Sequence, residues 1–269
     1  MISCNLQGGL GNQMFQIAAT YALAKRNNDT ALFNFETCHT PLQGNPSLKY
    51  KGNILHKVPN STEIKTSVVY HEPSFEYNEL PYAPNLLLNG YFQSEKYFED
   101  CKEDIKKMFK PDSSLIGITH NFLYPYWVQY NQTVFIHIRR GDYLKNPDYH
   151  PVCEVSYYEK AMAMFDENTA FIVVSDDMEW AKENIKGPNV AYSPFEDEIM
   201  DFYLMTQCNN GIISNSSFSW WAAWLISDTY WHREKGQPNK KIIAPKKWFG
   251  PKGPKDTQDI IPKDWEIVE

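Results

Sequence analysis

Short apolar runs alternate with stretches of helical periodicity along most of the chain. Residues 2–6 are predicted to form a strand, and a glycine-rich turn follows them. In residues 12–26, apolar side chains such as Ala18 and Ala22 recur at helical spacing, which predicts a helix. Residues 30–35 then have the pattern of a second strand. This order of elements predicts a Rossmann-like βαβ start.

A second series of alternating strands and helices begins near residue 134. Its run 170–174 is almost wholly apolar, which is typical of the middle of a parallel sheet. The predicted strands are 134–138, 170–174, 190–192, 211–213 and 241–244, and the predicted helices are 155–165, 178–185, 198–208 and 218–226.

The region between the two series is less regular. Residues 36–84 have no period and are expected to form loops and short pieces. Residues 86–92 are predicted to be a strand and residues 97–109 a helix. The stretch 111–132 is interpreted as a linker between two α/β halves.

Composition narrows the class of protein. The 269 residues are 42% hydrophobic and 22% charged, so the chain can bury a core. A net charge of -7 argues against a general nucleic-acid binder. No apolar run reaches the roughly 18 residues that a transmembrane helix needs, and the first residues lack the pattern of a signal peptide. The five cysteines include no C-x-x-C pair, so we expect a cytoplasmic protein without a disulfide framework.

The glycine turn is the first candidate binding site. Gly9, Gly11 and Asn12 lie between a predicted strand and a predicted helix, where backbone N–H groups can approach a phosphate. The alternative is a tight turn that binds no ligand.

Two adjacent arginines follow the predicted strand 134–138. Arg139 and Arg140 lie where α/β sheets bind ligands, and arginine suits bidentate phosphate binding. Neighbouring strand residues point to opposite faces, so we expect one of the two to reach a given phosphate. The alternative is a surface ion pair between an arginine and Asp142.

Two further strand ends carry polar residues. Ser216 and Ser217 precede a predicted helix and offer hydroxyls and free N–H groups to an anion. Asp176 follows another strand, where an acid can receive a ribose hydroxyl or a base N–H. For all three residues the alternative is ordinary helix capping.

Several motifs are missing from the sequence. It contains no Asp-x-Asp, no pair of histidines at metal-ligand spacing, no P-loop and no nucleophile elbow. We therefore expect no metal site, and expect arginine and helix N-termini to neutralise a diphosphate.

The motifs in 8–16, 137–143 and 214–225 together resemble those of the α-1,2-fucosyltransferases, glycosyltransferase family 11. The match spans the chain in the family's order. The resemblance implies an α/β, GT-B-like fold with two Rossmann-like domains facing a central cleft. We place the domains at 1–130, on the acceptor side, and 131–269, on the donor side.

The resemblance also implies an activity. The donor would be GDP-β-L-fucose, no metal or cofactor would be needed, and transfer would invert the anomeric centre to give an α-linkage on O2 of a galactose. The acceptor would be a galactose-containing oligosaccharide or a lipid-linked glycan. By resemblance, Arg139 binds the β-phosphate and His137 lies near the guanine or ribose. The other donor-binding candidates are Gly9, Gly11, Asn12, Arg140, Asp176, Ser216, Ser217 and Phe218.

The acceptor hydroxyl must lose a proton, and three residues are candidates for the base: Asp142, Asp148 and His150. We rank Asp142 first, although an ion pair with arginine would weaken it as a base. A transferase using another GDP-sugar or linkage, and a non-catalytic nucleotide- or glycan-binding module, stay open. A lysine-rich stretch, residues 235–255, suits peripheral contact with the inner membrane face, against the alternative of simple solvation.

Overall fold

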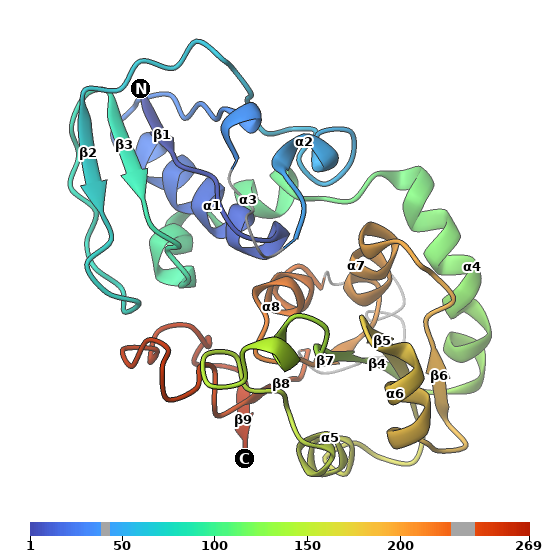
Figure 1. Cartoon of the computed structure of the whole chain (residues 1–269). Helices are drawn as coiled ribbons and strands as arrows, with labels where there is room; N and C mark the ends of the chain where they lie inside the picture. The colour runs from blue at the N-terminus through green and yellow to red at the C-terminus, as the bar shows by residue number, and fades with distance from the viewer. Residues whose placement is uncertain (39–43, 227–239) are drawn as a thin grey trace. The chain divides into compact units, whose positions relative to one another are not determined.

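The computed structural model describes residues 1–38, 44–226 and 240–269, which fold as two compact α/β units (Figure 1). Unit 1 comprises Met1–Lys110 and Pro254–Pro262, and unit 2 comprises Pro111–Gly253 and Lys263–Glu269. The observed division therefore follows Lys110, where the sequence suggested a boundary after residue 130.

Unit 1 is built on a parallel three-stranded sheet in the order β1-β3-β2. The predicted strand 30–35 is wrong: only isolated bridges form there, at Ala31 and Phe33. The expectation of loops and short pieces in 36–84 missed strand β2. The elements are β1 (Ile2–Cys4), α1 (Leu10–Arg26), η1 (Phe35–Thr37), α2 (Ser47–Tyr50), β2 (Val68–His71), β3 (Leu86–Asn89), η2 (Glu95–Cys101) and α3 (Lys102–Met108).

The segment 254–262 returns to unit 1 after the chain has passed through unit 2. Asp259 accepts a hydrogen bond from the backbone N–H of Tyr77 at 2.9 Å and forms an ion pair with Lys96. Ile260 is fully buried. These contacts explain why a segment near the end of the chain belongs to the first unit.

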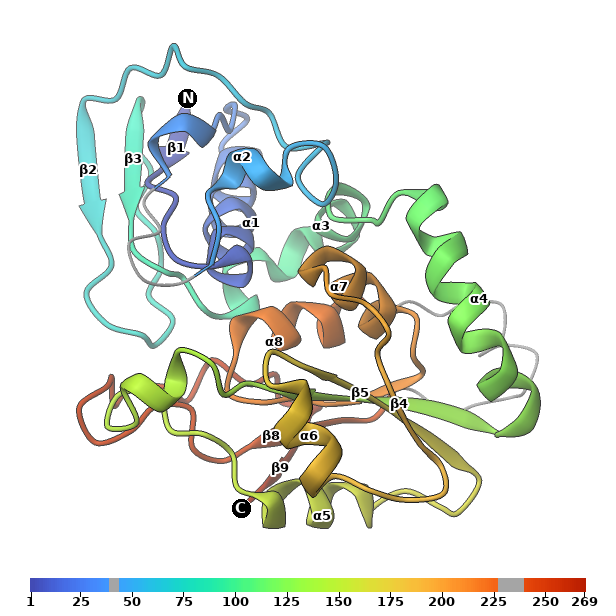
Figure 2. The same cartoon turned by 45° about the vertical axis from the view of Figure 1, so that its right-hand side comes forward.

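Unit 2 is built on a parallel six-stranded sheet in the order β6-β5-β4-β7-β8-β9. Figure 2 shows α7 and α8 on one face of this sheet and α5 and α6 on the other. The elements are α4 (Ser113–Gln129), β4 (Gln132–Ile138), η3 (Tyr143–Lys145), α5 (Val155–Met162), β5 (Thr169–Ser175), α6 (Met178–Asn184), β6 (Val190–Tyr192), α7 (Glu198–Thr206), β7 (Asn210–Ile212), α8 (Ser217–Trp224), β8 (Ile242–Pro245) and β9 (Glu266–Val268).

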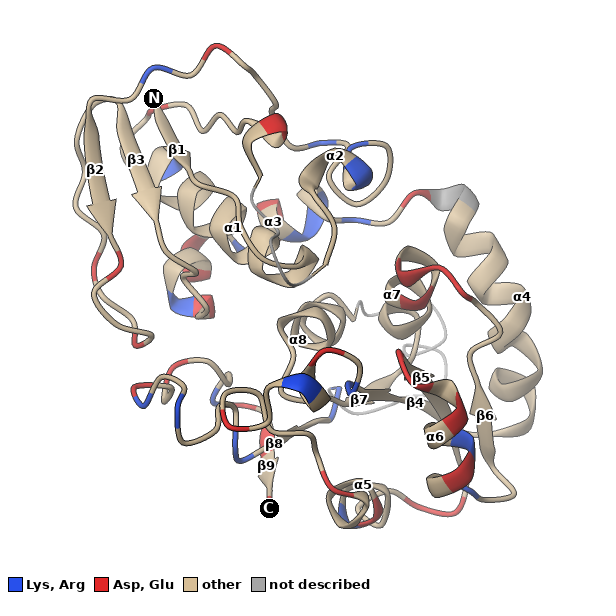
Figure 3. Cartoon of the chain, viewed as in Figure 1, with Lys and Arg blue, Asp and Glu red and all other residues tan. Residues whose placement is uncertain are grey.

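The predicted linker 111–132 is wrong, because most of it is the helix α4. Thr119, Leu123 and Trp127 are buried at a spacing of four, and α4 packs against α7. Pro125 lies inside the helix and removes one N–H donor, but it is exposed to solvent. Burial of this stripe stabilises the helix by more than the hydrogen bond lost at Pro125 destabilises it. Figure 3 shows no charge along the described part of α4.

Side chains along β4 alternate between the two faces of the sheet, and this alternation positions the site. Val134, Ile136 and Ile138 pack with α5 and α6 in one core cluster. The side chain of His137 points to the opposite face of the sheet and contacts the ring of Phe218 on α8, with ring centroids 5.6 Å apart. The strand ends where Ile138 leaves the sheet, so the following residues emerge at its carboxyl edge.

Candidate active site

Arg139 lies at the carboxyl end of β4 and binds two carboxylates. Its Nη2 is 2.5 Å from Oδ1 of Asp142, and its Nη1 is 3.0 Å from Oδ2 of Asp176. The parallel register pairs Ile138 with Ser175, which brings Asp176 beside the arginine. Burial alone would lower the pKa of Arg139, but the charges of Asp176 and Asp142 outweigh it and raise that pKa. The guanidinium is therefore a fixed cation, held from two sides.

Gly141 permits this approach. A Cβ at Gly141 would lie 2.7 Å from Oδ2 of Asp176, the oxygen that pairs with Arg139. Any larger residue would push the carboxylate away from the guanidinium. The glycine in this motif is thus required by close packing rather than by an unusual backbone angle.

Arg140 binds a different element. Its Nε is 2.9 Å from Oδ2 of Asp177, and its guanidinium lies over the ring of Trp180, 4.0 Å from the centroid. Asp177 also caps α6 by accepting the N–H of Trp180 at 3.2 Å. The two arginines therefore have separate surroundings, and Arg140 fastens the end of β4 to α6. Its contact with a donor stays a prediction.

His137 is buried beneath this edge of the sheet, with 4% of its surface exposed. Its Nδ1 is 2.9 Å from Oγ of Ser214, which follows β7. Burial and the charge of Arg139 lower the pKa of His137 to about 3. The imidazole is neutral at ordinary pH, so it can take part in hydrogen bonding but is not poised to exchange protons near pH 7.

The start of α8 lies at the neighbouring strand end. Oγ of Ser216 accepts the N–H of Phe218 at 3.3 Å, so Ser216 is the N-cap of this helix. The capping alternative is therefore true of Ser216, and binding of an anion at Ser216, Ser217 or Phe218 stays a prediction.

Tyr143 and Asn215, which were not predicted as site residues, connect these two parts. The Tyr143 hydroxyl donates to the backbone oxygen of Asn215 at 2.9 Å, and the guanidinium of Arg139 lies over the Tyr143 ring, 5.5 Å from its centroid. The Asn215 amide donates to the carbonyls of Pro151 and Trp248 at 2.9 and 3.0 Å. Both residues lie inside the motifs already singled out, so their position there was the available signal.

The three base candidates have different environments. Both carboxylate oxygens of Asp142 are shielded from solvent and make no hydrogen bond within the described residues, so the ion pair with Arg139 is their main interaction. His150 stacks on Tyr143, with centroids 4.6 Å apart. Burial lowers the pKa of His150, Asp142 opposes this shift and Arg139 adds to it. Asp148 is more than half exposed and pairs with Lys252 at 2.9 Å. Asp142 and His150 thus belong to the arginine cluster, and Asp148 does not.

The glycine turn lies in unit 1. Gly8 has φ +76°, in the left-handed region, and a Cβ there would lie 2.5 Å from Nδ2 of Asn12. Gly9 is the N-cap of α1 without a side-chain hydrogen bond, and Gly11 is buried in the first turn. Oδ1 of Asn12 accepts from Nε2 of Gln93 at 2.8 Å. These contacts fix the conformation of the turn within unit 1, and its contact with a phosphate stays a prediction.

Two buried glutamines hold this turn and were not predicted as site residues. Nε2 of Gln13 donates to the carbonyls of Gly8 and Asn45, both at 2.9 Å, and its Oε1 accepts from Ser47 at 2.8 Å. Nε2 of Gln16 donates to the Gly90 carbonyl at 3.0 Å. The burial of both glutamines is visible only in the structure, because helical periodicity alone would place a polar side chain toward solvent.

The lysine-rich stretch is largely paired where it is described. Residues 235–239 lie outside the described part of the chain. Lys241 pairs with Glu266, Lys246 with Glu269 and Lys252 with Asp148. No described helix has the length and apolar content needed to cross a bilayer. Within the described ranges, no group of three or more His, Cys, Asp or Glu side chains could hold a metal ion.

Comparison with known proteins gives relatives over nearly the whole chain. Escherichia coli O-antigen biosynthesis glycosyltransferase WbnK is 31% identical over 93% of this chain and 95% of its own length. Escherichia coli alpha-1,2-colitosyltransferase is 29% identical over 92% and 98%. Galactoside alpha-(1,2)-fucosyltransferase 1 of Rattus norvegicus is 31% identical over 95% and 72%.

A solved structure is similar in fold. The NodZ alpha-1,6-fucosyltransferase co-crystallized with GDP superimposes with a TM-score of 0.54 over 82% of this chain and 90% of that one, at 16% identity. The α/β, GT-B-like fold class predicted from the sequence is thereby confirmed. The family model described as glycosyl transferase family 11 matches residues 1–247. The resemblance inferred from the three motifs is therefore confirmed, and the chain belongs to glycosyltransferase family 11.

Proposed function

We propose that this glycosyltransferase moves L-fucose from GDP-β-L-fucose to O2 of a galactose in a glycan acceptor, with inversion and without a metal ion. The observation that carries the proposal is Arg139, a cation fixed by two carboxylates at the carboxyl end of β4. The names of the relatives, which include galactoside α-1,2-fucosyltransferases, support the linkage and the class of acceptor. NodZ crystals contain GDP or were soaked with GDP-fucose, which supports the donor.

In this mechanism, Arg139 receives the charge that develops on the leaving diphosphate. A preorganised cation in a partly buried place stabilises that charge without having to reorganise during the reaction. The N–H groups at the start of α8 add a second anion-binding element next to Tyr143 and Asn215. No residue here needs to form a covalent intermediate, because a single in-line displacement inverts the anomeric centre.

The local charges require a rearrangement when the donor binds. Arg139 and Arg140 carry two positive charges, and Asp142, Asp176 and Asp177 carry three negative charges, so the cluster has a net charge of about -1. A diphosphate would be repelled by this cluster unless Arg139 exchanges one carboxylate for phosphate oxygens. We assign this exchange to Asp176, whose freed carboxylate can then receive a donor hydroxyl or base N–H.

For the proton of the acceptor hydroxyl, we assign an orienting role to Asp142 and the base role to His150. The shielded oxygens of Asp142 face Arg139, so an acceptor hydroxyl would have to break the ion pair to reach them. His150 has a lowered pKa and is neutral near pH 7, as a base must be. Asp148, exposed and paired with Lys252, is the weakest of the three candidates.

A colitosyl donor is the second candidate, because the Escherichia coli alpha-1,2-colitosyltransferase aligns over 98% of its own length. The test is a panel of GDP-sugars and glycan acceptors read by mass spectrometry. The proposal expects a mass gain of one fucose on β-galactosides, with the new linkage at O2 and the α configuration by NMR. Exclusive use of the colitosyl donor would replace the proposed donor. Binding of GDP-fucose with no transfer to any acceptor would leave a non-catalytic module.

The same panel should include free oligosaccharides and a lipid-linked galactoside. A cytoplasmic enzyme with peripheral membrane contact would favour the lipid-linked acceptor in the presence of vesicles. Equal rates with both acceptors, with and without vesicles, would contradict a contribution from the membrane surface.

A further inference from the structure

Unit 1 contains a cavity of about 590 Å³ at the end of α1, remote from the glycine turn. It is lined by the last turn of α1 and its C-cap, by residues 77 and 79–82, and by Tyr97. The glycine turn precedes the first residue of α1, and the cavity adjoins the last. A helix of 17 residues is about 25 Å long, so the cavity is a separate place on this unit. Its volume is within the range of small-molecule sites.

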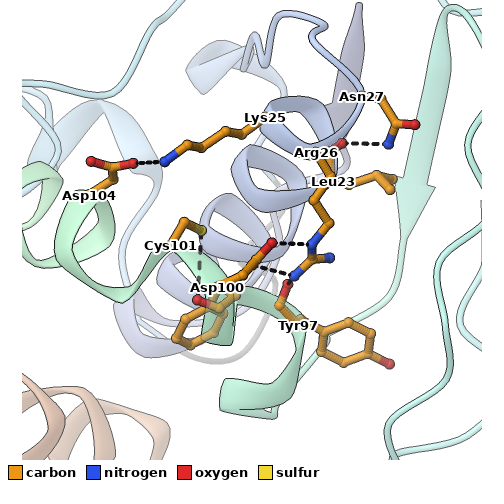
Figure 4. Close-up of polar contacts among 9 residues, drawn as sticks. Leu23, Lys25, Arg26, Asn27, Tyr97, Asp100, Cys101 and Asp104 are labelled. Carbon is orange, nitrogen blue, oxygen red and sulfur yellow. Dashed lines mark hydrogen bonds and ion pairs between the residues drawn. The ribbon is translucent and has the colours of Figure 1, made fainter.

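Arg26 is the charged residue on the polar wall of the cavity that comes from α1, and Figure 4 shows its polar contacts. Its Nε and Nη2 donate to the Asp100 carboxylate at 2.7 Å each, and Nη2 also donates to the Tyr97 carbonyl at 2.7 Å. These bonds fix the plane of the guanidinium. Among the described contacts Nη1 has no partner, so its two N–H groups are available donors. The next residue, Asn27, uses its amide nitrogen on the Leu23 carbonyl at 2.9 Å, which leaves its amide oxygen as an acceptor.

Tyrosine rings supply the other wall. Tyr82 is 45% exposed, and its hydroxyl is held by the Asp29 carboxylate at 3.4 Å. The Tyr77 ring packs on the buried Tyr97 ring, with centroids 4.9 Å apart. Anchored rings of this kind present a flat face whose electron density attracts polarised C–H groups.

The charges around the cavity exclude an anionic ligand. The charge of Arg26 is balanced by Asp100, and the neighbouring Lys25 is paired with Asp104 (Figure 4). Glu79 also lines the cavity, so the local balance is about -1. The proposed donor site adjoins the start of α8, whereas this cavity adjoins the C-terminal end of α1, whose dipole adds to the negative balance and disfavours a phosphate or a nucleotide. A hydrocarbon would leave the amide, carboxylate and guanidinium unpaired.

We propose that this cavity binds a neutral oligosaccharide, at a site of unit 1 that is separate from the glycine turn. Paired donors and acceptors suit vicinal hydroxyls, and anchored tyrosines suit the C–H face of a sugar ring. The inference rests on the proposed function only for the class of ligand, because a glycan acceptor is a chain of sugars. The site would hold a part of such a chain that is not itself fucosylated.

The test uses the full chain labelled with 3-fluorotyrosine and observed by ¹⁹F NMR. Resonances of Tyr77, Tyr82 and Tyr124 are assigned with single Tyr→Phe variants, and Tyr124 is the control because it is 58% exposed on α4 of the other unit. Titration with the neutral tetrasaccharide lacto-N-tetraose is expected to shift Tyr77 and Tyr82 saturably, with a roughly millimolar Kd, and to leave Tyr124 unmoved. No shift of Tyr82, or equal shifts of Tyr82 and Tyr124, would overturn the proposal.

Ligand class and residue roles are tested by the same signals. The anionic 3′-sialyllactose and GDP should not shift Tyr82, and a shift as strong as that by the neutral sugar would contradict the assigned class. Tyr82→Ala, followed through Tyr77, should weaken binding roughly 3- to 10-fold, while Tyr124→Ala changes nothing. Because binding is read without transfer, loss of the NMR response and failure of the donor and acceptor panel are independent results.

Discussion

Two polar regions of this enzyme differ in the kind of side chain that builds them. The end of β4 in unit 2 uses charges: Arg139 and Arg140 are surrounded by carboxylates. The glycine turn in unit 1 uses neutral amides: Gln13 and Gln16 bind backbone carbonyls around the turn. Charges are suited to a ligand whose own charge changes during reaction, whereas buried amides shape a backbone without attracting or repelling an anion. The first region should therefore control turnover, and the second should control the shape and stability of its unit.

The largest expected effect is at Arg139. Arg139→Ala and Arg139→Lys should each reduce turnover by roughly 10²- to 10³-fold or more, because lysine lacks the planar fork. Steady-state kinetics with GDP-fucose measures the loss, and circular dichroism checks the fold. Arg140→Lys is the matched control and should lose less, since its cation mainly holds α6. A folded Arg139→Lys enzyme with normal activity would remove Arg139 from the mechanism.

The next effect separates His150 from Asp142. His150→Gln should lower turnover roughly 10²-fold or more with GDP affinity retained, as expected for a lost base. Asp142→Asn should lower GDP affinity and turnover together, because the guanidinium loses one support. Asp148→Asn should resemble the unmodified enzyme. Calorimetric titration with GDP measures the affinity of each variant, and steady-state kinetics measures its turnover. Retained GDP affinity in Asp142→Asn would return the base role to Asp142.

In the amide region the expected loss is stability. Gln13→Ala removes the side-chain donor that Gln13 gives to the carbonyls of Gly8 and Asn45, which should cost roughly 1–3 kcal/mol of unfolding free energy. Gln129→Ala, at the exposed end of α4, is the matched control and should stay within about 0.5 kcal/mol. Denaturant unfolding measures both. An unchanged midpoint in Gln13→Ala would show that the glycine turn does not depend on this amide.

Two buried groups, one in each unit, should contribute opposite dependences of stability on pH. Burial and Arg139 lower the pKa of His137 to about 3, so between about pH 3 and 6.5 the unfolded state binds more protons and His137 contributes stability that grows as pH rises. Burial raises the pKa of Asp201 in the same unit to about 7, and this carboxyl contributes in the other direction between about pH 3.8 and 7. Burial raises the pKa of Glu72, which accepts the N–H groups of Tyr91 and Phe92, to about 7. Between about pH 4.5 and 7 the folded state binds more protons, so unit 1 loses stability as pH rises.

Hydrogen exchange resolved by unit between pH 4.5 and 6.5 checks this contrast. Each group contributes a slope of at most about 1.4 kcal/mol per pH unit. His137→Asn should flatten the slope in β4, and Glu72→Gln should flatten it in β3. An unchanged slope in β4 of His137→Asn, or in β3 of Glu72→Gln, would contradict the assignment.

The smallest expected effect is that of a chelator. Because an arginine and a helix start are assigned to the leaving diphosphate, EDTA should leave the initial rate of transfer nearly unchanged. Complete loss of activity, restored by Mn²⁺, would mean that the charged region binds its donor through a cation.

The sequence by itself determined the order of the strands and α-helices from β4 to β8 in unit 2, and it singled out the charged residues at the end of β4. Long apolar strands and regular periods made β4, β5 and the helices that follow predictable, because local pattern and burial agree there. Arg139 and Asp176 were predictable as neighbours in principle, since parallel strands end at one edge. Helix α4 could not be predicted from the sequence. Its proline, its aromatic residues and its lack of charged residues obscure the helical spacing of the side chains that pack against α7.

Only the tertiary structure decided which polar residues act together. Asp148 and His150 are two residues apart, yet the ring stacks beside Arg139 and the carboxylate turns outward to Lys252. The role of Gln13 at the glycine turn is visible only in the fold, where its side chain forms hydrogen bonds with Asn45 and Ser47. Such contacts join residues far apart in sequence, and their free energy depends on distance and desolvation. A local pattern contains neither quantity, so these assignments had to come from the fold.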